Sequence, residues 1–317
     1  MKNLTLPLLL IAATPLLGLA CGSDPTTNGT TPTSTTTSTA PDGAPTGTTT
    51  ATAPDGSSPQ EDSGNPPGNP DAGPTTPGTV GMAGIAAWDA LPAGEKAKLT
   101  SFVSLFLHQS VGQDLEDAAR ANGFGFEYVD GSNEGRSLSI TKNGLHGGLA
   151  GSNGNPQTKT ATMLNAANGN PGKIKVAILK FGYADVLSSN RATTEGLYTS
   201  LVSSLKAKGI RVLHVTPPFV FNVPSDNAPK MLTRNWMLQT FPNDVIFDLE
   251  DVESTEAASG ARCERGGSWE ICNSNRSTSG CVSPQGLDAP SGQGHLCPVQ
   301  ARRMVKAFLY SIYQAGK

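Results

Sequence analysis

The chain has little charge and few aromatic residues, and one long stretch has no basic and no aromatic residue. Charged residues make up 15% and aromatic residues 6% of the 317 residues. Residues 22–80 contain no Lys, Arg, Phe, Tyr or Trp, and 43 of these 59 residues are Gly, Ser, Thr or Pro. A stretch with so little apolar surface cannot offset its own ordering entropy. We therefore expect residues 22–80 to form a disordered linker.

The sequence also lacks basic runs and long apolar runs. Lys2 is the only basic residue before position 81, so residues 81–317 carry 22 Lys or Arg against 20 Asp or Glu. A nearly neutral domain without a basic run argues against nucleic acid as a partner. No apolar run reaches the length of a membrane-spanning helix. Residues 81–317 have a normal length for one globular domain with a single large core.

Residues 1–21 have the pattern of an export signal. Lys2 precedes an apolar stretch from Leu6 to Leu19, and Cys21 follows it closely. A short apolar segment before a small residue is typical of a secretory signal peptide. The position of Cys21 resembles that in a bacterial lipoprotein signal. The resemblance implies that Cys21 is lipidated and anchors the exported protein to a membrane, on its periplasmic or cell-surface side. The alternative is plain secretion with a free Cys21.

The other cysteines lie in one window of the chain, residues 263–297. They are Cys263, Cys272, Cys281 and Cys297. An even number of clustered cysteines in an exported chain favours two disulfides, with three pairings possible. Zinc binding is the alternative, but the window has no C-x-x-C pair. We expect two disulfides in a Cys-rich loop beside His295, and no metal or organic cofactor.

Residues 81–317 alternate between strand-like and helix-like segments. We expect strands at residues 102–107, 124–129, 175–181, 211–215 and 245–249, and helices at 113–121, 194–207, 228–240 and 299–313. Residues 131–172 are rich in Gly and Asn with little periodicity, so they predict a long functional loop with room for one short helix. The alternation predicts an α/β fold with a mostly parallel sheet between two layers of helices.

Functional residues of such sheets gather at the carboxyl ends of the strands. Ser110 lies there, between the first expected strand and a helix, where amides at the helix N-terminus can stabilise an oxyanion. His295 precedes the last helix, and Asp185 and Asp248 follow other strands. A Ser, a His and a carboxylate at one edge are the parts of a nucleophile–base pair. The plainer alternatives are that Ser110 caps its helix and that His295 lies on the surface.

Five blocks of sequence strengthen the catalytic interpretation. They are Phe106–Gly112, Gly151–Lys159, Lys180–Asp185, Phe247–Ser254 and Gly294–Leu296. In this order they resemble the SGNH (GDSL-like) hydrolase superfamily, in a bacterial branch whose first block reads H-x-S-x-G. The resemblance implies a flavodoxin-like three-layer sandwich and a serine esterase without a cofactor. It makes Ser110 the nucleophile and His295 the general base.

The resemblance also implies an oxyanion hole. Its donors are the backbone amide of Ser110 and that of Gly151 or Gly154. Members of the superfamily add an Asn side chain from a G-x-N-D block, but Ala184 stands at that position here. Asn153, in the neighbouring block, is the candidate substitute.

The carboxylate that supports His295 is a second departure. The superfamily places an Asp three residues before the His, and Gly292 stands there in this chain. Asp288, seven residues before His295, is the first candidate, and Asp248 and Asp185 are the alternatives. Lys180 is expected to pair with a carboxylate such as Asp185, with contact to substrate as the alternative. Trp269, in the Cys-rich loop, is a core residue or a platform for a sugar ring.

These observations predict an exported serine esterase that forms an acyl-enzyme on Ser110. Its expected substrates are O-acyl groups, such as acetyl, on cell-envelope or extracellular polysaccharide, by family analogy. Two alternatives remain open. One is an O-acyltransferase with the same residues, and the other is a surface binding or structural module that has lost turnover.

Overall fold

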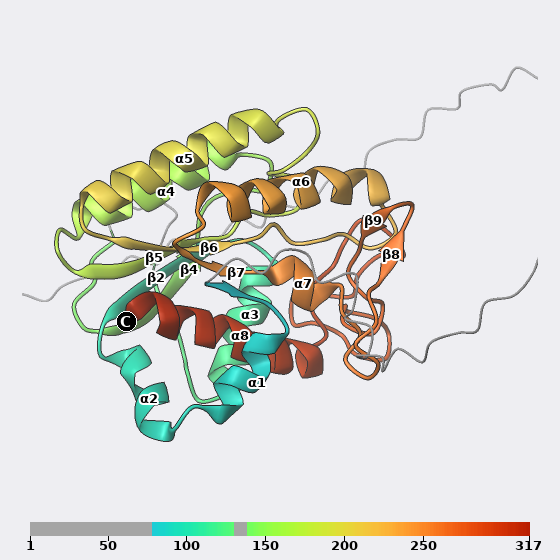
Figure 1. The fold of residues 1–317 in the computed structure, drawn as a ribbon, viewed down its shortest axis with the longest axis horizontal. Coiled ribbons are helices and arrows are strands. Elements are labelled where there is room, and N and C mark those ends of the chain that lie inside the picture. The colour runs from blue at the N-terminus through green and yellow to red at the C-terminus, as the bar shows by residue number, and fades with distance from the viewer. Residues whose placement is uncertain (1–77, 130–137) are drawn as a thin grey trace, which may run out of the picture. The chain divides into compact units, whose positions relative to one another are not determined.

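The computed structural model describes residues 78–129 and 138–317, which form a seven-stranded parallel sheet with helices on both faces (Figure 1). The strands are β1 (Thr79–Val80), β2 (Val103–His108), β3 (Glu127–Tyr128), β4 (Gly144–Leu149), β5 (Ile174–Leu179), β6 (Arg211–Val215) and β7 (Val245–Phe247). Their order in the sheet is β1-β7-β6-β5-β2-β4-β3. Cys21, the expected signal peptide and residues 22–77 of the expected linker lie outside the described residues.

The helices divide between the two faces of the sheet. One face carries α1 (Ala83–Ala90), α2 (Ala93–Ala97), a short 3₁₀ helix (Lys98–Thr100), α3 (Val111–Ala121) and α8 (Pro298–Gly316). The other carries α4 (Pro156–Gly169), α5 (Arg191–Ala207) and α6 (Pro224–Thr240), and α7 (Leu249–Glu253) follows β7. The predicted three-layer α/β class is therefore confirmed. In the described residues, no helix has the length and hydropathy needed to span a membrane.

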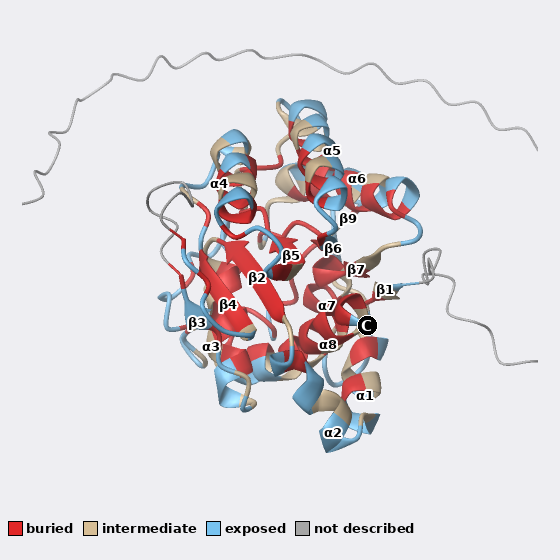
Figure 2. Cartoon of the chain, turned by 90° about the vertical axis from the view of Figure 1, so that its left-hand side faces the viewer, coloured by how far each residue is buried: buried red, intermediate tan, exposed pale blue. Residues whose placement is uncertain are grey.

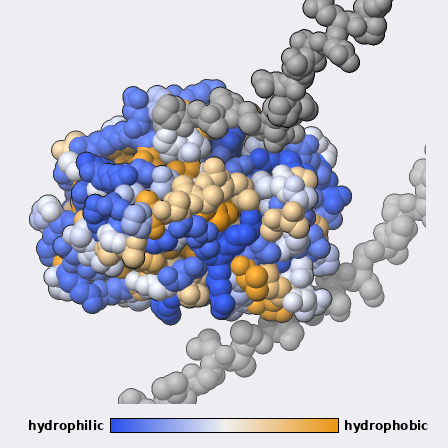
Figure 3. All heavy atoms as spheres, turned by 60° about the horizontal axis from the view of Figure 1, so that its bottom comes forward, coloured by the Kyte–Doolittle hydropathy of each residue, from blue (hydrophilic) through white to orange (hydrophobic). Residues whose placement is uncertain are grey.

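The sheet is buried on both faces, which explains the apolar runs in its central strands. Phe106 of β2 packs in one hydrophobic cluster with Phe308 of α8, whereas Leu105 and Leu107 pack in the other cluster with Tyr198 of α5. All six residues of β2 are buried, as Figure 2 shows for the centre of the sheet. Because β2 is packed on both faces, the core holds it in place. The outer face beside α1 and α2 is mostly hydrophilic, with small hydrophobic patches (Figure 3).

The expected long loop at residues 131–172 is wrong, because β4 and α4 lie within it. In β4 the glycines are required by close packing. A Cβ on Gly147 would lie 1.6 Å from a carboxylate oxygen of Glu116, and one on Gly148 would lie 2.1 Å from the Val129 carbonyl oxygen. In α4 the buried face includes Lys159, Thr160 and Thr162. Neither segment therefore shows the apolar periodicity of its structure.

The order of the strands makes the carboxyl end of β2 a topological switch point. The chain enters α3 after β2 and α4 after β4, and these helices cover opposite faces of the sheet. The exits of β4 and β5 flank that of β2, because the Ala150 amide donates to the His108 carbonyl (2.9 Å) and the Lys180 amide to the Leu107 carbonyl (3.0 Å). Ligands of open α/β sheets bind at such a switch point.

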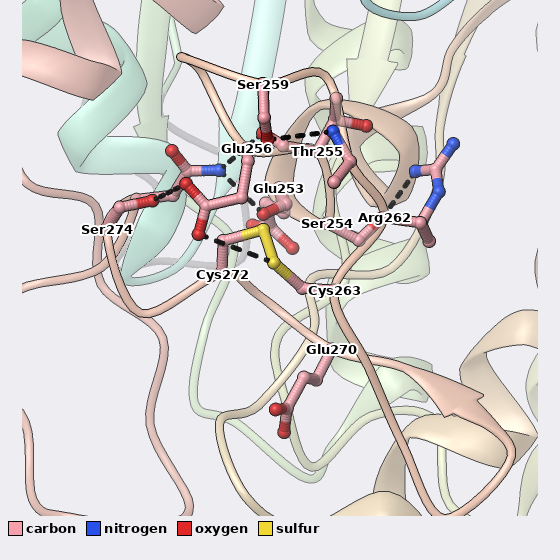
Figure 4. Close-up of a disulfide and its surroundings, with 12 residues drawn as sticks. Glu253, Ser254, Thr255, Glu256, Ser259, Arg262, Cys263, Glu270, Cys272 and Ser274 are labelled. Atoms are coloured by element: carbon pink, nitrogen blue, oxygen red, sulfur yellow. Dashed lines mark hydrogen bonds between the residues drawn. A yellow bond between two sulfur atoms is a disulfide. The ribbon is translucent and has the colours of Figure 1, made fainter.

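The Cys-rich segment contains two disulfides, as predicted. They join Cys263 to Cys272 and Cys281 to Cys297. A small hairpin, β8 (Glu264–Arg265) and β9 (Ser268–Trp269), lies inside the first loop. Glu256 lies beside the first disulfide, where its carboxylate also accepts a hydrogen bond from Ser274 (2.7 Å; Figure 4). The sulfurs are bonded to each other and so are not available as thiolate ligands for zinc.

Candidate active site

Ser110 occupies a strained turn between β2 and α3. Its φ of 52° and ψ of −107° lie outside the regions that side-chain-bearing residues favour. Its hydroxyl does not cap the helix, and instead contacts Nε2 of His295. Gly112 permits this turn, since a Cβ there would lie 2.2 Å from the His108 ring. A strained, half-buried serine at a strand-to-helix turn is the geometry of a nucleophile elbow.

The strain at Ser110 leads to a stability prediction. The free energy of unfolding of Ser110→Gly should be about 1 kcal/mol larger than that of Ser110→Ala, because glycine adopts a positive φ without steric cost. Both variants lack the hydroxyl, so the difference isolates the backbone. Equilibrium urea unfolding measures it. A glycine variant less stable than the alanine variant would contradict the assignment of strain.

His295 is held from several sides just before α8. The hydrogen bonds run from the Gly294 amide to the Tyr183 hydroxyl (3.2 Å), from the Leu296 amide to Oδ2 of Asp114 (2.9 Å), and from the Ser277 amide to the His295 carbonyl (2.6 Å). Asp114 is buried on α3 and also accepts a hydrogen bond from Ser283 (2.6 Å). It therefore links the helix of Ser110 to the segment of His295. No motif in the sequence marks this role.

Asp288 is the carboxylate that faces His295. Its Oδ1 lies 3.4 Å from Nδ1 of His295, and its side chain is fully buried. Arg276 lies 3.8 Å from the other oxygen and donates to the Ala289 carbonyl (3.1 Å), which holds the loop in place. Catalytic hydrogen bonds are often long without substrate and tighten when it binds. The structure thus places Ser110 at one ring nitrogen of His295 and Asp288 near the other.

The two alternative carboxylates are engaged elsewhere. Asp248 accepts bonds from Nε (2.9 Å) and Nη2 (2.6 Å) of Arg234 and caps α7. Asp185 forms a buried ion pair with Lys159. The expected pairing of Lys180 with Asp185 is therefore wrong, and the Lys180 ammonium donates to the Phe181 carbonyl (3.0 Å).

Trp269 is already in contact with two arginine side chains. The guanidinium of Arg262 lies 3.9 Å from the ring centroid, and that of Arg234 lies 5.0 Å from it. Both groups are held by aspartates, Arg262 by Asp251 and Arg234 by Asp248. The ring is therefore part of the packing between α6 and the Cys-rich segment.

Of the backbone amides expected to form the oxyanion hole, one already has a hydrogen-bond acceptor within the protein. Among the described residues, no acceptor is found for the backbone amides of Ser110 and Gly151. The Gly154 amide donates to Oδ1 of Asp185 (2.7 Å), so its assignment as a donor to substrate is wrong. The Gly151 carbonyl accepts from the Gln109 side chain, which ties the loop after β4 to the Ser110 turn. The amides of Ser110 and Gly151 therefore remain as candidate backbone donors.

Comparisons with known proteins show a likeness to solved structures. No protein-family model and no curated protein match the chain. One similar solved structure is a "putative acylhydrolase" from Bacteroides fragilis, which is 12% identical, with a TM-score of 0.41. The match covers 71% of this chain and 95% of that one.

The ionisation of the site favours neutral pH. Burial lowers the pKa of His295, and the positive charge of Lys180 lowers it further. Burial raises the pKa of Asp288 to about 6, against the opposing effect of Arg276. A base must be neutral to accept a proton, and the supporting carboxylate must be ionised. Both groups reach these forms as the pH rises past the middle of the acidic range.

This ionisation leads to a pH prediction. The rate of acylation at Ser110 should increase with pH up to about 6.5 and remain level from about 7.5 to 9. The rate of labelling by a fluorophosphonate, measured across that range, reports the midpoint. The two groups interact, so the midpoint belongs to the pair. A midpoint above about 6.5, the ordinary pKa of histidine, would contradict a lowered pKa at His295.

Proposed function

We propose that the protein is a serine ester hydrolase of SGNH type, with Ser110 as the nucleophile, His295 as the base and Asp288 as its support. The observation that carries the proposal is the contact between the strained Ser110 hydroxyl and Nε2 of His295, with Asp288 behind the ring. A strained residue costs on the order of 1–3 kcal/mol and persists where the fold holds it for function. A binding module has no need of such a serine.

The chemistry follows from these positions. His295 Nε2 takes the Ser110 proton as Oγ attacks the acyl carbon, and Asp288 stabilises the imidazolium that forms. The amides of Ser110 and Gly151 donate to the oxyanion of the tetrahedral intermediate. When the intermediate collapses, the C–O bond to the alcohol breaks and His295 returns the proton to the leaving oxygen. Water then attacks the acyl-enzyme by the same steps, which releases the acid and free Ser110.

The proposed substrates are O-acyl groups, such as acetyl, on cell-envelope or extracellular polysaccharide. The two disulfides fit an oxidising, exported location. The lipoprotein-like start suggests that Cys21 anchors the protein to a membrane, near such polymers. Transfer of the acyl group to a sugar hydroxyl would use the same residues. Release of free acetate without an added sugar would distinguish hydrolysis from transfer.

Covalent labelling tests the proposal. Purified protein treated with a fluorophosphonate should gain the mass of one adduct, and Ser110→Ala should gain none, because only an activated serine attacks phosphorus at a useful rate. Ser203→Ala is the matched control, since Ser203 is exposed on α5. It should label like the wild type. No adduct on wild type, under conditions that label a known esterase, would leave the binding module as the better interpretation.

A further inference from the structure

The loop that follows β4 reaches across the carboxyl end of β2. The Gly154 amide donates to Asp185, which follows β5 (2.7 Å). The Asn153 side chain lies directly on Gly182, where a Cβ would be 1.9 Å from its Oδ1. Because β2 lies between β4 and β5 in the sheet, a link between their exits passes over the end of β2. Ser110 follows that end by two residues.

The side-chain amide of Asn153 is bound through its oxygen atom, which accepts a hydrogen bond from Lys159. Lys159 lies fully buried on α4, and its ammonium donates to Oδ1 of Asn153 (3.2 Å). An ammonium only donates, so it selects the oxygen and leaves the Nδ2 group on the other side. Asn153 itself is exposed, and no acceptor for Nδ2 is found among the described residues. The Nδ2 group, which can donate a hydrogen bond, therefore remains available in the loop that crosses the end of β2.

Two small residues provide the space for this arrangement. Gly182 has no side chain to displace the Asn153 amide. Ala184 lies against the same loop, since a Cβ on Gly154 would be 3.8 Å from the Ala184 Cβ. An asparagine at 184 would extend toward the position of this loop. The side-chain donor expected at 184 and the one present at 153 thus belong to neighbouring parts of one site.

We propose that Lys159 is a positioning residue that orients Asn153. In this orientation, Nδ2 of Asn153 donates to the carbonyl oxygen of the ester that Ser110 attacks. The proposal rests on the proposed function, because it names the third donor of the same oxyanion hole. Its alternative is that Lys159 only neutralises the buried Asp185. The two interpretations differ in whether the effect of Lys159 requires Asn153.

Asn153 variants test the donor. Asn153→Ala should lower kcat for p-nitrophenyl acetate about 10²-fold or more, with KM changed less than about threefold, as for other single oxyanion donors. Asn153→Asp keeps the shape and the Lys159 contact but cannot donate, and so should lose at least as much. Asn168→Ala, exposed on α4, is the matched control and should keep the wild-type rate. A kcat for Asn153→Ala within about threefold of wild type would overturn the proposal.

Lys159 variants test the orientation. Lys159→Gln and Lys159→Met both remove the charge that pairs with Asp185, but only glutamine can still donate to Asn153. We expect Lys159→Gln to keep a kcat about tenfold or more above that of Lys159→Met, and the two to be equal when combined with Asn153→Ala. Equal rates with Asn153 present, or a difference that persists without it, would show that Lys159 acts only on Asp185.

Gly182→Ala gives a test that keeps both charges of the buried ion pair between Lys159 and Asp185. The new methyl group displaces Oδ1 of Asn153, so kcat should fall toward that of Asn153→Ala, with no further loss in the double variant. A wild-type rate for Gly182→Ala in a folded protein would overturn the orientation by Lys159. Fluorophosphonate labelling of wild type separates the two proposals. If wild type is labelled at Ser110 but Asn153→Ala has the kcat of wild type, only this inference fails. If Ser110 is not labelled at all, the proposed function fails.

Discussion

Asp288→Asn should lower kcat for ester hydrolysis by on the order of 10³- to 10⁴-fold with little change in KM, which is the loss expected when a triad carboxylate becomes an amide. In the proposed triad, the carboxylate oxygen 3.4 Å from Nδ1 would select the tautomer of His295 that leaves Nε2 free to accept the Ser110 proton. An asparagine can present its NH₂ group to Nδ1 and so favour the opposite tautomer. It also cannot stabilise the imidazolium. Stopped-flow or steady-state hydrolysis of an activated ester measures the loss.

Asp248→Asn is the control, because Asp248 was the other strand-end candidate for this role. Its carboxylate binds Arg234 and caps α7, and it has no contact with His295. We expect lower stability, since Arg234 loses its charged partner, but a kcat near that of wild type below the melting temperature. The assignment of Asp288 would be wrong if Asp248→Asn lost more kcat than Asp288→Asn.

Removing the disulfide between Cys281 and Cys297 should reduce both stability and activity. The sequence separations of the two disulfides are 16 and 9, so each cross-link should contribute about 3 kcal/mol to the free energy of unfolding. Only the loop closed by Cys281 and Cys297 contains Asp288 and His295. Cys281→Ser combined with Cys297→Ser should therefore lower kcat at least tenfold at a temperature where the protein stays folded.

The other disulfide is the matched control for this prediction. Cys263→Ser combined with Cys272→Ser should cost similar stability, but it should leave kcat within about twofold, because its loop holds neither Asp288 nor His295. Circular dichroism melting measures stability, and ester hydrolysis measures kcat. Equal losses of kcat in the two double variants would show that the disulfides affect the site only through global stability.

Much of the fold was predictable because its central strands are buried on both sides. Apolar runs such as those of β2, β5 and β6 follow from that burial, and they predicted the parallel sheet. β4 and α4 were not predictable by the same rule. Gly147 and Gly148 are selected by close packing and not by hydropathy, and the inner face of α4 includes a buried lysine.

The site was predictable only where local sequence carries the geometry. Ser110 was expected from a strand-to-helix turn, and Asp288 from its closeness in sequence to His295. Asp114 left no such signal, because its partner Leu296 is 182 residues away and the contact is made by tertiary packing. Gly154 was misassigned for a related reason. A glycine in a loop shows that an amide is accessible, but not that a distant carboxylate such as Asp185 already binds it.

The place where the chain enters the sheet has a mechanical consequence. β1, only two residues long, pairs with β7 at the edge of the sheet, and β7, β6 and β5 separate it from β2. If the protein is tethered through its N-terminal segment, tension on that tether acts first on the short β1–β7 pair. This pair would detach before force reached the Ser110 turn. A protein held at a surface and pulled by flow or by a bound polymer would therefore keep the Ser110 turn folded.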